Sequence, residues 1–221
     1  MSELFLSPLT VTIVIATVAV TIVSFRNRAL YGRLLFSVDE VLGPRTEWWR
    51  IASSALVHAD YMHLALNMFS LFMFGRWFEH IIGSWRFGLL YLLGAVVGSF
   101  ASLIVHRSAP SYRAVGASGA VCAVIAASTV LLPDLPMMFL FIPVPLPAWI
   151  MGSLFVFYSA YVSGRGYDNI GHEAHLGGTV AGIGMMIAFY PSLALENVYA
   201  IAAMMAAGGL AWLLRRRSMR S

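Results

Sequence analysis

Long apolar blocks separated by short polar stretches dominate this sequence. We count seven of them, near residues 6–25, 60–79, 86–105, 115–132, 147–163, 172–190 and 196–214. Each approaches the roughly 20 apolar residues that a helix needs to cross the hydrocarbon core of a bilayer. Because lipid offers no hydrogen-bond partners, only helices and closed barrels span it, and these blocks are too long and too uniformly apolar for barrel strands. The sequence therefore predicts an all-α polytopic membrane protein.

Composition supports that class. Of the 221 residues, 60% are hydrophobic and 11% are charged, and the mean hydropathy is +0.80, whereas soluble domains carry about 25% charged residues. Every basic residue is an arginine, and the arginines lie at the edges of the apolar blocks, which indicates membrane anchoring and not a nucleic-acid patch. The single cysteine, Cys122, excludes an intramolecular disulfide framework and a multi-cysteine zinc site.

The ends of the blocks predict how the chain is oriented. No basic segment precedes the first block, so we expect a retained span and not a cleaved signal peptide. If the spans alternate in direction, every arginine except Arg76 and Arg86 lies on the side where the even-numbered spans begin. The positive-inside rule would put that side in the cytoplasm.

The connections between blocks suggest the domain organisation. Residues 26–57 form the longest connection, and their Trp48-Trp49 pair is typical of an interfacial anchor. A loop of about 30 residues is often functional, although it can simply lie on the surface. Residues 133–147 are rich in proline, so we expect no continuous helix there. We predict one helical membrane domain with up to seven spans.

Polar side chains within spans are costly, and they mark candidate functional sites. His63 and Asn67 lie near the start of the second block, Ser118 near the start of the fourth and His175 near the start of the sixth. Successive spans cross in alternate directions, so these three starts lie on one side of the membrane. At about 1.5 Å per residue, the four side chains also share a similar, shallow depth. A common site requires both conditions.

Small residues flank the serine and the histidine. Gly116 and Gly119 surround Ser118, and Gly178 follows His175 by three residues. Small residues at helical spacing let two spans approach closely. Since a serine oxygen must come within about 3 Å of a base nitrogen to hand over its proton, we predict Ser118 as nucleophile and His175, as neutral imidazole, as general base.

The remaining polar pair suits an oxyanion site. Acyl transfer needs hydrogen-bond donors directed at the oxygen that becomes negatively charged, and the loss of one donor costs about a hundredfold or more in rate. Histidine and asparagine side chains can supply such donors. We therefore predict that His63, Asn67 and the backbone N–H of Ser118 stabilise the oxyanion.

Each residue alone has a plainer interpretation. A serine among small residues usually serves helix packing, a single histidine in a span is more often a polar contact or a gate, and Cys122 is interpreted as a small buried hydrophobe. His172 and His175 are three residues apart, one fewer than in the zinc-protease motif, which disfavours a metal site. Haem ligation by His63 and His175 would leave the serine and asparagine without a role. The enzyme hypothesis rests on the combination.

Taken in order, these motifs resemble the rhomboid family of intramembrane serine proteases. The resemblance runs from about Trp49 to about Gly184, which is most of the chain. It is carried by Trp49-Arg50, His58, His63-Leu64-Ala65-Leu66-Asn67, the spaced Gly75, Glu79 and Gly83, Gly116-Ala117-Ser118-Gly119, and His175-Leu176-Gly177-Gly178 with Gly182. Any one motif is weak, but the set in this order is specific.

The resemblance implies a six-span core with a water-filled cavity open to one side. It implies a Ser118–His175 dyad without an acidic third member, oxyanion stabilisation by His63 and Asn67, and no cofactor or metal. The expected partners are the bilayer and membrane proteins whose transmembrane helices are cleaved, not nucleic acid. The seventh block resembles the family's six-plus-one arrangement, which implies a six-span catalytic core over residues 1–190 and an additional C-terminal span with an Arg-rich tail over residues 191–221. The family analogy puts the active site outside a prokaryotic cell membrane, in conflict with the arginine distribution.

Two alternatives and one departure stay open at this stage. A non-catalytic rhomboid-like protein would share the fold but typically lacks the serine or the histidine, and a transporter would be expected to show an internal repeat, for which we find no convincing sign. Gly116, Gly119, His58 and Cys122 are predicted to support the site. Family members commonly carry an aromatic residue at the position of Cys122, packed on the catalytic histidine, so we expect His175 to be held less firmly or from another direction.

Overall fold

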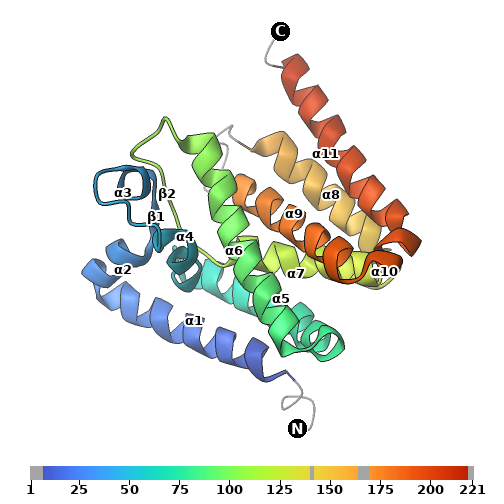
Figure 1. The fold of residues 1–221 in the computed structure, drawn as a ribbon, viewed down its shortest axis with the longest axis horizontal. Helices are drawn as coiled ribbons and strands as arrows, with labels where there is room; N and C mark the ends of the chain where they lie inside the picture. Colours follow the sequence, from blue (N-terminus) through green and yellow to red (C-terminus); the bar gives the residue numbers. More distant parts are fainter. Residues whose placement is uncertain (1–6, 140–141, 164–169, 219–221) are drawn as a thin grey trace.

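The computed structural model describes residues 7–139, 142–163 and 170–218. Helices dominate this part of the chain (Figure 1). The long ones are α1 (Pro8–Arg26), α5 (Tyr61–Ile82), α6 (Ser84–His106), α7 (Ser118–Leu131), α8 (Ala148–Val162), α9 (His172–Phe189) and α11 (Val198–Ser218). Each coincides with one of the apolar blocks to within a few residues, so the helical prediction is confirmed.

Three of the helices in the described residues are long and apolar enough to cross a membrane on their own, namely α1, α6 and α11. The helices α7 and α8 are equally apolar but shorter. This content is that of an integral, polytopic helical membrane protein.

Two small antiparallel ribbons show that the fold is not purely α-helical. β1 (Phe36–Ser37) pairs with β2 (Arg113–Ala114), and β3 (Pro136–Phe139) pairs with β4 (Ile142–Pro147). The second ribbon occupies the proline-rich stretch, where a continuous helix was not expected. Each strand of the first ribbon is two residues long, and the two strands are far apart in the sequence. Strands this short show no alternation of apolar and polar residues from which they could be predicted.

The connection between α1 and α5 folds into short helices at the left of Figure 1. These are α2 (Arg28–Leu34), α3 (Val38–Leu42), α4 (Arg50–Ser53) and the 3-10 turn η2 (Ser54–Leu56). The Arg50 guanidinium is buried, pairs with Glu47 at 2.6 Å and donates to the backbone carbonyls of Gly32 in α2 and of Leu35 directly after it. The Trp-Arg motif thus holds this connection together.

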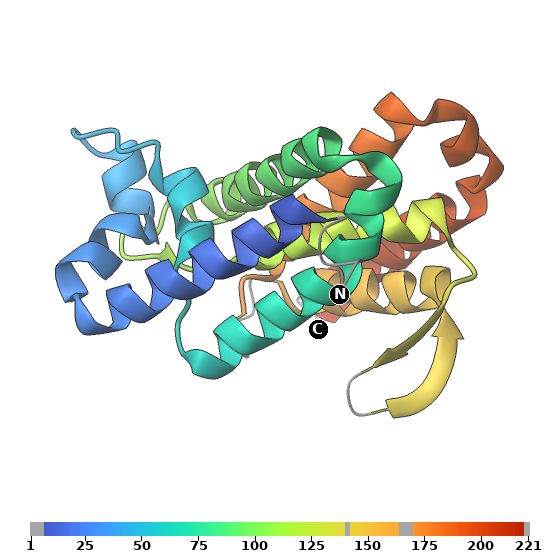
Figure 2. The same ribbon diagram turned by 90° about the horizontal axis from the view of Figure 1, so that it is seen from below.

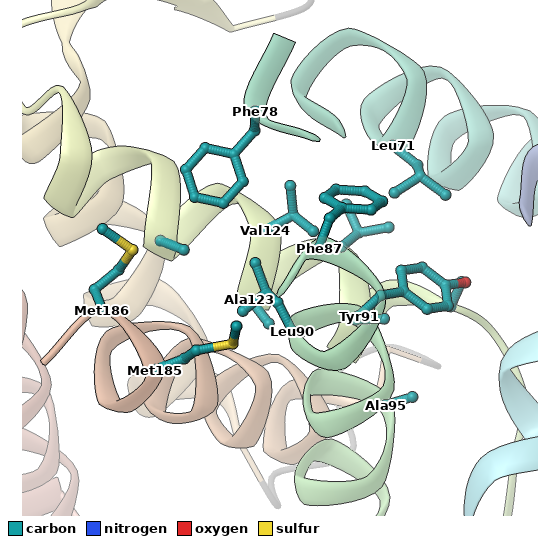
Figure 3. Close-up of a cluster of buried hydrophobic side chains, with 14 of the residues drawn as sticks. Leu71, Phe78, Phe87, Leu90, Tyr91, Ala95, Ala123, Val124, Met185 and Met186 are labelled. Carbon is teal, nitrogen blue, oxygen red and sulfur yellow. The ribbon is translucent and has the colours of Figure 1, made fainter. Parts of the chain in front are cut away.

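Helix α7 lies at the centre of the molecule, between α5, α6, α8 and α9 (Figure 2). Its side chains are buried along nearly the whole length. Large apolar residues of α5 and α6, among them Phe78, Phe87 and Leu90, pack on Val124 of α7, and Met186 of α9 closes the other side (Figure 3). The central helix needs small and β-branched residues because neighbours surround it.

Glycines set the distance between α6, α7 and α9. A methyl group at Gly178 of α9 would overlap the carbonyl oxygen of Gly119 in α7, and a methyl at Gly98 of α6 would lie 2.8 Å from the carbonyl oxygen of Ala174. Such contacts leave no room for a side chain, so the backbones touch. This close approach positions the candidate site.

The helix α11 packs along α8, and α10 (Pro191–Glu196) leads into it from α9. Gly152 of α8 lies against the sulfur of Met204, and Gly208 of α11 lies against Val156 of α8. Asn197 donates to the carbonyl of Val130 at the end of α7. The seventh apolar block is therefore part of the packed helical body.

Candidate active site

Ser118 is the first residue of α7, directly after a tight backbone turn. Gly116 has φ +118°, a conformation that a residue with a side chain rarely adopts. The turn ends the preceding segment and aims the start of α7 toward α5 and α9. First-turn N–H groups of a helix lack intrahelical partners and carry a partial positive charge. The Ser118 side chain, which is half-buried, thus stands beside ready hydrogen-bond donors.

The turn before Ser118 is fixed by the end of the first connection. The Gly116 N–H donates to the carbonyl of Ser54 at 2.9 Å, and the Ala117 N–H donates to Nε2 of His58 at 3.3 Å. His58 is fully buried, and its Nδ1 lies 3.1 Å from Oγ1 of Thr21 in α1. Since Nε2 accepts a hydrogen bond, the proton of His58 sits on Nδ1 and is donated to Thr21.

Burial, with a smaller contribution from the neighbouring His63, lowers the pKa of His58 to about 4, although Asp60 acts in the opposite direction. The neutral form is also the one that the geometry requires, because a protonated His58 could not accept from the Ala117 N–H. His58 therefore supports the candidate nucleophile through the backbone and does not contact it as a base.

Acid is expected to destabilise the protein through His58. The unfolded histidine titrates near pH 6.5 and the folded one near 4, so protons bind the unfolded state first as pH falls. The full stabilisation is present above about pH 6.5, and about 3 kcal/mol is lost between pH 6.5 and 4. Thermal unfolding in detergent at pH 4, 5, 6 and 7 measures it. Between pH 6.5 and 4, His58→Gln is expected to lose less stability than wild type. Equal acid losses in the two proteins would contradict this assignment.

His63 is brought onto the same turn. A methyl group at Gly116 would lie 2.6 Å from Cε1 and 2.8 Å from Nε2 of the His63 ring. Asp60 caps the start of α5 by accepting from the His63 N–H at 2.7 Å, which fixes this first turn. Asn67, one turn further and buried, donates from Nδ2 to the His63 carbonyl at 2.9 Å. One of the two N–H donors of Asn67 is therefore used within its own helix.

His175 lies in the first turn of α9, next to the first turn of α7. The methyl position on Gly119 is 3.2 Å from the carbonyl oxygen of Ala174, the residue before the histidine. Gly178, one turn after the histidine, touches the backbone of Gly119. The structure therefore brings the beginnings of α5, α7 and α9 together, as the positions of the polar clusters predict.

The His175 ring is held from a direction other than that of Cys122, which is one of the two outcomes expected from the sequence. Phe155 of α8 packs on it with ring centroids 5.5 Å apart, and the His172 ring lies 5.8 Å away. Cys122, at the position where an aromatic residue is common, is a buried free thiol. An aromatic neighbour thus comes from another helix. Nothing in the uniformly apolar sequence of α8 singles out Phe155.

Glu173 is a second residue that the sequence does not reveal. It is buried, accepts from the Ser163 hydroxyl at 2.8 Å, and its other oxygen lies 3.6 Å from Nε2 of His106. The His106 ring stacks on Tyr112 at 3.7 Å. These contacts join the ends of α6 and α8 to the start of α9, beside His175.

Two of the motifs lie away from this cluster. Arg50 holds the first connection, and Glu79 lies at the far end of α5, beside Gly83. Both carboxylate oxygens of Glu79 accept hydrogen bonds from the first turn of α1. These residues stabilise the frame that carries the candidate site.

Comparison with known proteins agrees with the pattern of motifs. A family model described as Rhomboid domain matches residues 45–192. "Rhomboid protein 1, mitochondrial" of Saccharomyces cerevisiae is 32% identical over 150 residues, 66% of this chain and 43% of the relative. "Rhomboid protease GluP" of Bacillus subtilis is 30% identical over 138 residues, 62% of this chain and 25% of the relative. "RHOMBOID-like protein 12, mitochondrial" of Arabidopsis thaliana is 28% identical over 169 residues, 70% of this chain and 49% of the relative.

In each case the match covers less than half of the relative's own length. These relatives are mitochondrial in two cases and bacterial in one, so they give no support to the expected prokaryotic membrane in particular. The family model covers well over half of the chain, and it includes every motif named above. The protein is a helical integral membrane protein, and it belongs to the rhomboid family.

Proposed function

We propose that this protein is an intramembrane serine protease that cleaves transmembrane helices of other membrane proteins. The observation that carries the proposal is the glycine contact between Gly119 and Gly178. It holds the beginning of α9 against the first turn of α7, and these two segments carry His175 and Ser118. The names of relatives such as the Bacillus subtilis protease support the same activity.

The proposed chemistry is acyl transfer in two steps. The Ser118 oxygen attacks the carbonyl carbon of the scissile peptide bond, and His175 takes the hydroxyl proton and passes it to the leaving amine. The C–N bond breaks and an acyl-enzyme ester remains. Water, deprotonated by His175, then attacks the ester, and Ser118 recovers its proton.

Oxyanion stabilisation is assigned to three groups around the same turn. The Ser118 N–H belongs to the first turn of α7, where backbone donors lack helical partners. The His63 ring lies against Gly116, within reach of the same space. Asn67 would contribute the N–H that does not bind the His63 carbonyl.

The proposed membrane topology follows the helices. Residues 1–190 would form a core of six spans, made by α1, α5, α6, α7, α8 and α9, and α11 would be a seventh span in residues 191–221. Successive crossings then put the starts of α5, α7 and α9 on one side. A prokaryotic cell membrane stays a prediction. Substrates would be membrane proteins whose helix unwinds locally at that depth.

The test is labelling of the purified protein in detergent by a fluorophosphonate, which reacts with activated serines. Wild type is expected to be labelled, whereas Ser118→Ala and His175→Ala are expected to lose labelling, the first because the nucleophile is absent and the second because its base is. Ser128→Ala is the matched control, since Ser128 is a buried serine of the same helix whose hydroxyl donates to the Val124 carbonyl.

The outcomes separate the enzyme from a non-catalytic relative. Labelling that survives in Ser118→Ala, or that disappears equally in Ser128→Ala, would contradict the assignment of the nucleophile. A folded wild type without any labelling would favour a rhomboid-like protein that binds membrane proteins and does not cut them.

A further inference from the structure

A shallow cleft of about 420 Å³ lies between α2 and the residue before α4. Leu30, Arg33 and Leu34 of α2 line one wall and Trp49 lines the other. The cleft therefore combines one guanidinium with two aliphatic side chains and an indole ring. This is an amphipathic lining.

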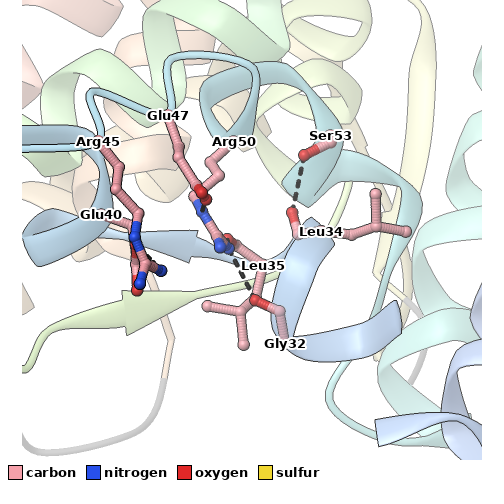
Figure 4. Close-up of polar contacts among 8 residues, drawn as sticks. All are labelled: Gly32, Leu34, Leu35, Glu40, Arg45, Glu47, Arg50 and Ser53. Atoms are coloured by element: carbon pink, nitrogen blue, oxygen red, sulfur yellow. Dashed lines mark hydrogen bonds and ion pairs between the residues drawn. The ribbon is translucent and has the colours of Figure 1, made fainter. Parts of the chain in front are cut away.

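Hydrogen bonds from α4 build the cleft (Figure 4). Nη1 of the buried Arg50 donates to the carbonyls of Gly32 and Leu35, at 2.7 and 2.9 Å, and the Ser53 hydroxyl donates to the Leu34 carbonyl at 2.8 Å. These bonds hold the backbone on both sides of Arg33 in place. The two walls are consequently held at a fixed separation before any ligand arrives.

Arg33 differs from the two ion-paired arginines of this connection. Arg50 pairs with Glu47 at 2.6 Å and Arg45 lies 3.6 Å from Glu40. Within the described part of the chain Arg33 has no ion pair, and its side chain is exposed. A cation beside apolar side chains attracts an anion that carries its own apolar part.

We infer that the cleft lies at the level of the membrane surface. The apolar helix α1 ends at Arg26, and α2 begins two residues later. Trp48 and Trp49 are both about half exposed, as interfacial indole rings are. Phospholipid phosphates lie at this depth, directly above acyl chains, so the expected anion is one that the bilayer itself supplies.

We propose that this cleft binds the phosphate headgroup of an anionic phospholipid. Arg33 pairs with the phosphate, and the first part of an acyl chain covers Leu30, Leu34 and Trp49. The cleft is connected to the candidate active site through the backbone, because α4 continues into η2, where the Ser54 carbonyl accepts from the Gly116 N–H. The lipid-binding claim itself does not depend on the proteolytic function.

Native mass spectrometry of the delipidated protein tests the site by titration with dioleoyl phosphatidylglycerol or dioleoyl phosphatidylcholine. Arg33→Gln is expected to weaken phosphatidylglycerol binding about tenfold, the loss of one charge-assisted contact. It is expected to weaken phosphatidylcholine binding less, because the choline cation of that lipid already offsets the charge of its phosphate. Trp49→Ala is expected to weaken phosphatidylglycerol binding as well, through the apolar wall. Arg33→Lys is expected to keep most of the affinity.

Arg28→Gln is the matched control, because Arg28 is an exposed arginine of the same helix outside the cleft. An equal loss in Arg28→Gln and Arg33→Gln would show attraction by surface charge in general and would overturn the proposal. Displacement of the lipid by inorganic phosphate at millimolar concentration would also overturn it, since the site would then bind phosphate without need of the chain. Wild-type unfolding temperatures in Arg33→Gln and Trp49→Ala confirm that the comparison concerns folded protein.

Discussion

Gly178→Ala is expected to separate α7 from α9 and to disable the candidate site. The added methyl would overlap the carbonyl oxygen of Gly119, and backbone cannot rotate away as a side chain can. Overpacking of this kind costs roughly 3 kcal/mol or more when it moves helices apart. A shift of about 1 Å between Ser118 and His175 is expected to reduce the rate of fluorophosphonate labelling about a hundredfold.

The matched control lies on the same helix. Gly184 has open space where a methyl group would go, so Gly184→Ala is expected to keep wild-type labelling and to change stability by less than about 1 kcal/mol. Thermal unfolding in detergent and labelling rates are measured for the three proteins. If Gly178→Ala is labelled at the wild-type rate and unfolds at the wild-type temperature, the glycine contact does not set the distance between the two helices. The main support for the dyad is then lost.

Much of this fold is predictable from hydrophobicity alone. Each apolar block became a helix with ends within a few residues of the expected ones, because block length and polarity decide where a helix leaves an apolar environment. Proline content predicted the break before α8. The convergence of α5, α7 and α9 followed from counting crossings, which requires no knowledge of packing.

The details that orient the site were not predictable in this way. His58 receives the Ala117 N–H across 59 residues, Phe155 reaches His175 from another helix, and β1 pairs with β2 across the chain. Each contact depends on the relative rotation and depth of two elements. A pattern of residue types along one helix does not contain that information. The Trp-Arg motif shows the same limit, since its sequence marks Arg50 but not the carbonyls that Arg50 binds.

Glu79→Ala is expected to detach the beginning of α1 and to cost about 4 kcal/mol of stability. Glu79 is 1% exposed, and four donors converge on its two oxygens: the N–H groups of Leu9 and Thr10 and the hydroxyls of Thr10 and Ser84, at 2.6–3.0 Å. The two N–H groups belong to the first turn of α1 and have no helical partner. Removal of the carboxylate leaves these donors buried and unsatisfied.

The loss of stability in Glu79→Ala is expected to affect the start of α1 before it affects the other helices. Hydrogen exchange at the start of α1 is expected to rise strongly in Glu79→Ala, while exchange in α9 changes little, because α9 makes no bond to Glu79. Glu40→Ala is the control, since the Glu40 carboxylate pairs with the exposed Arg45, and such a pair contributes less than about 1 kcal/mol. Uniform exchange changes across all helices would mean that Glu79 supports the whole bundle and not one helix. Wild-type unfolding of Glu79→Ala would mean that water replaces the carboxylate, and the α1 contact would then be incidental to stability.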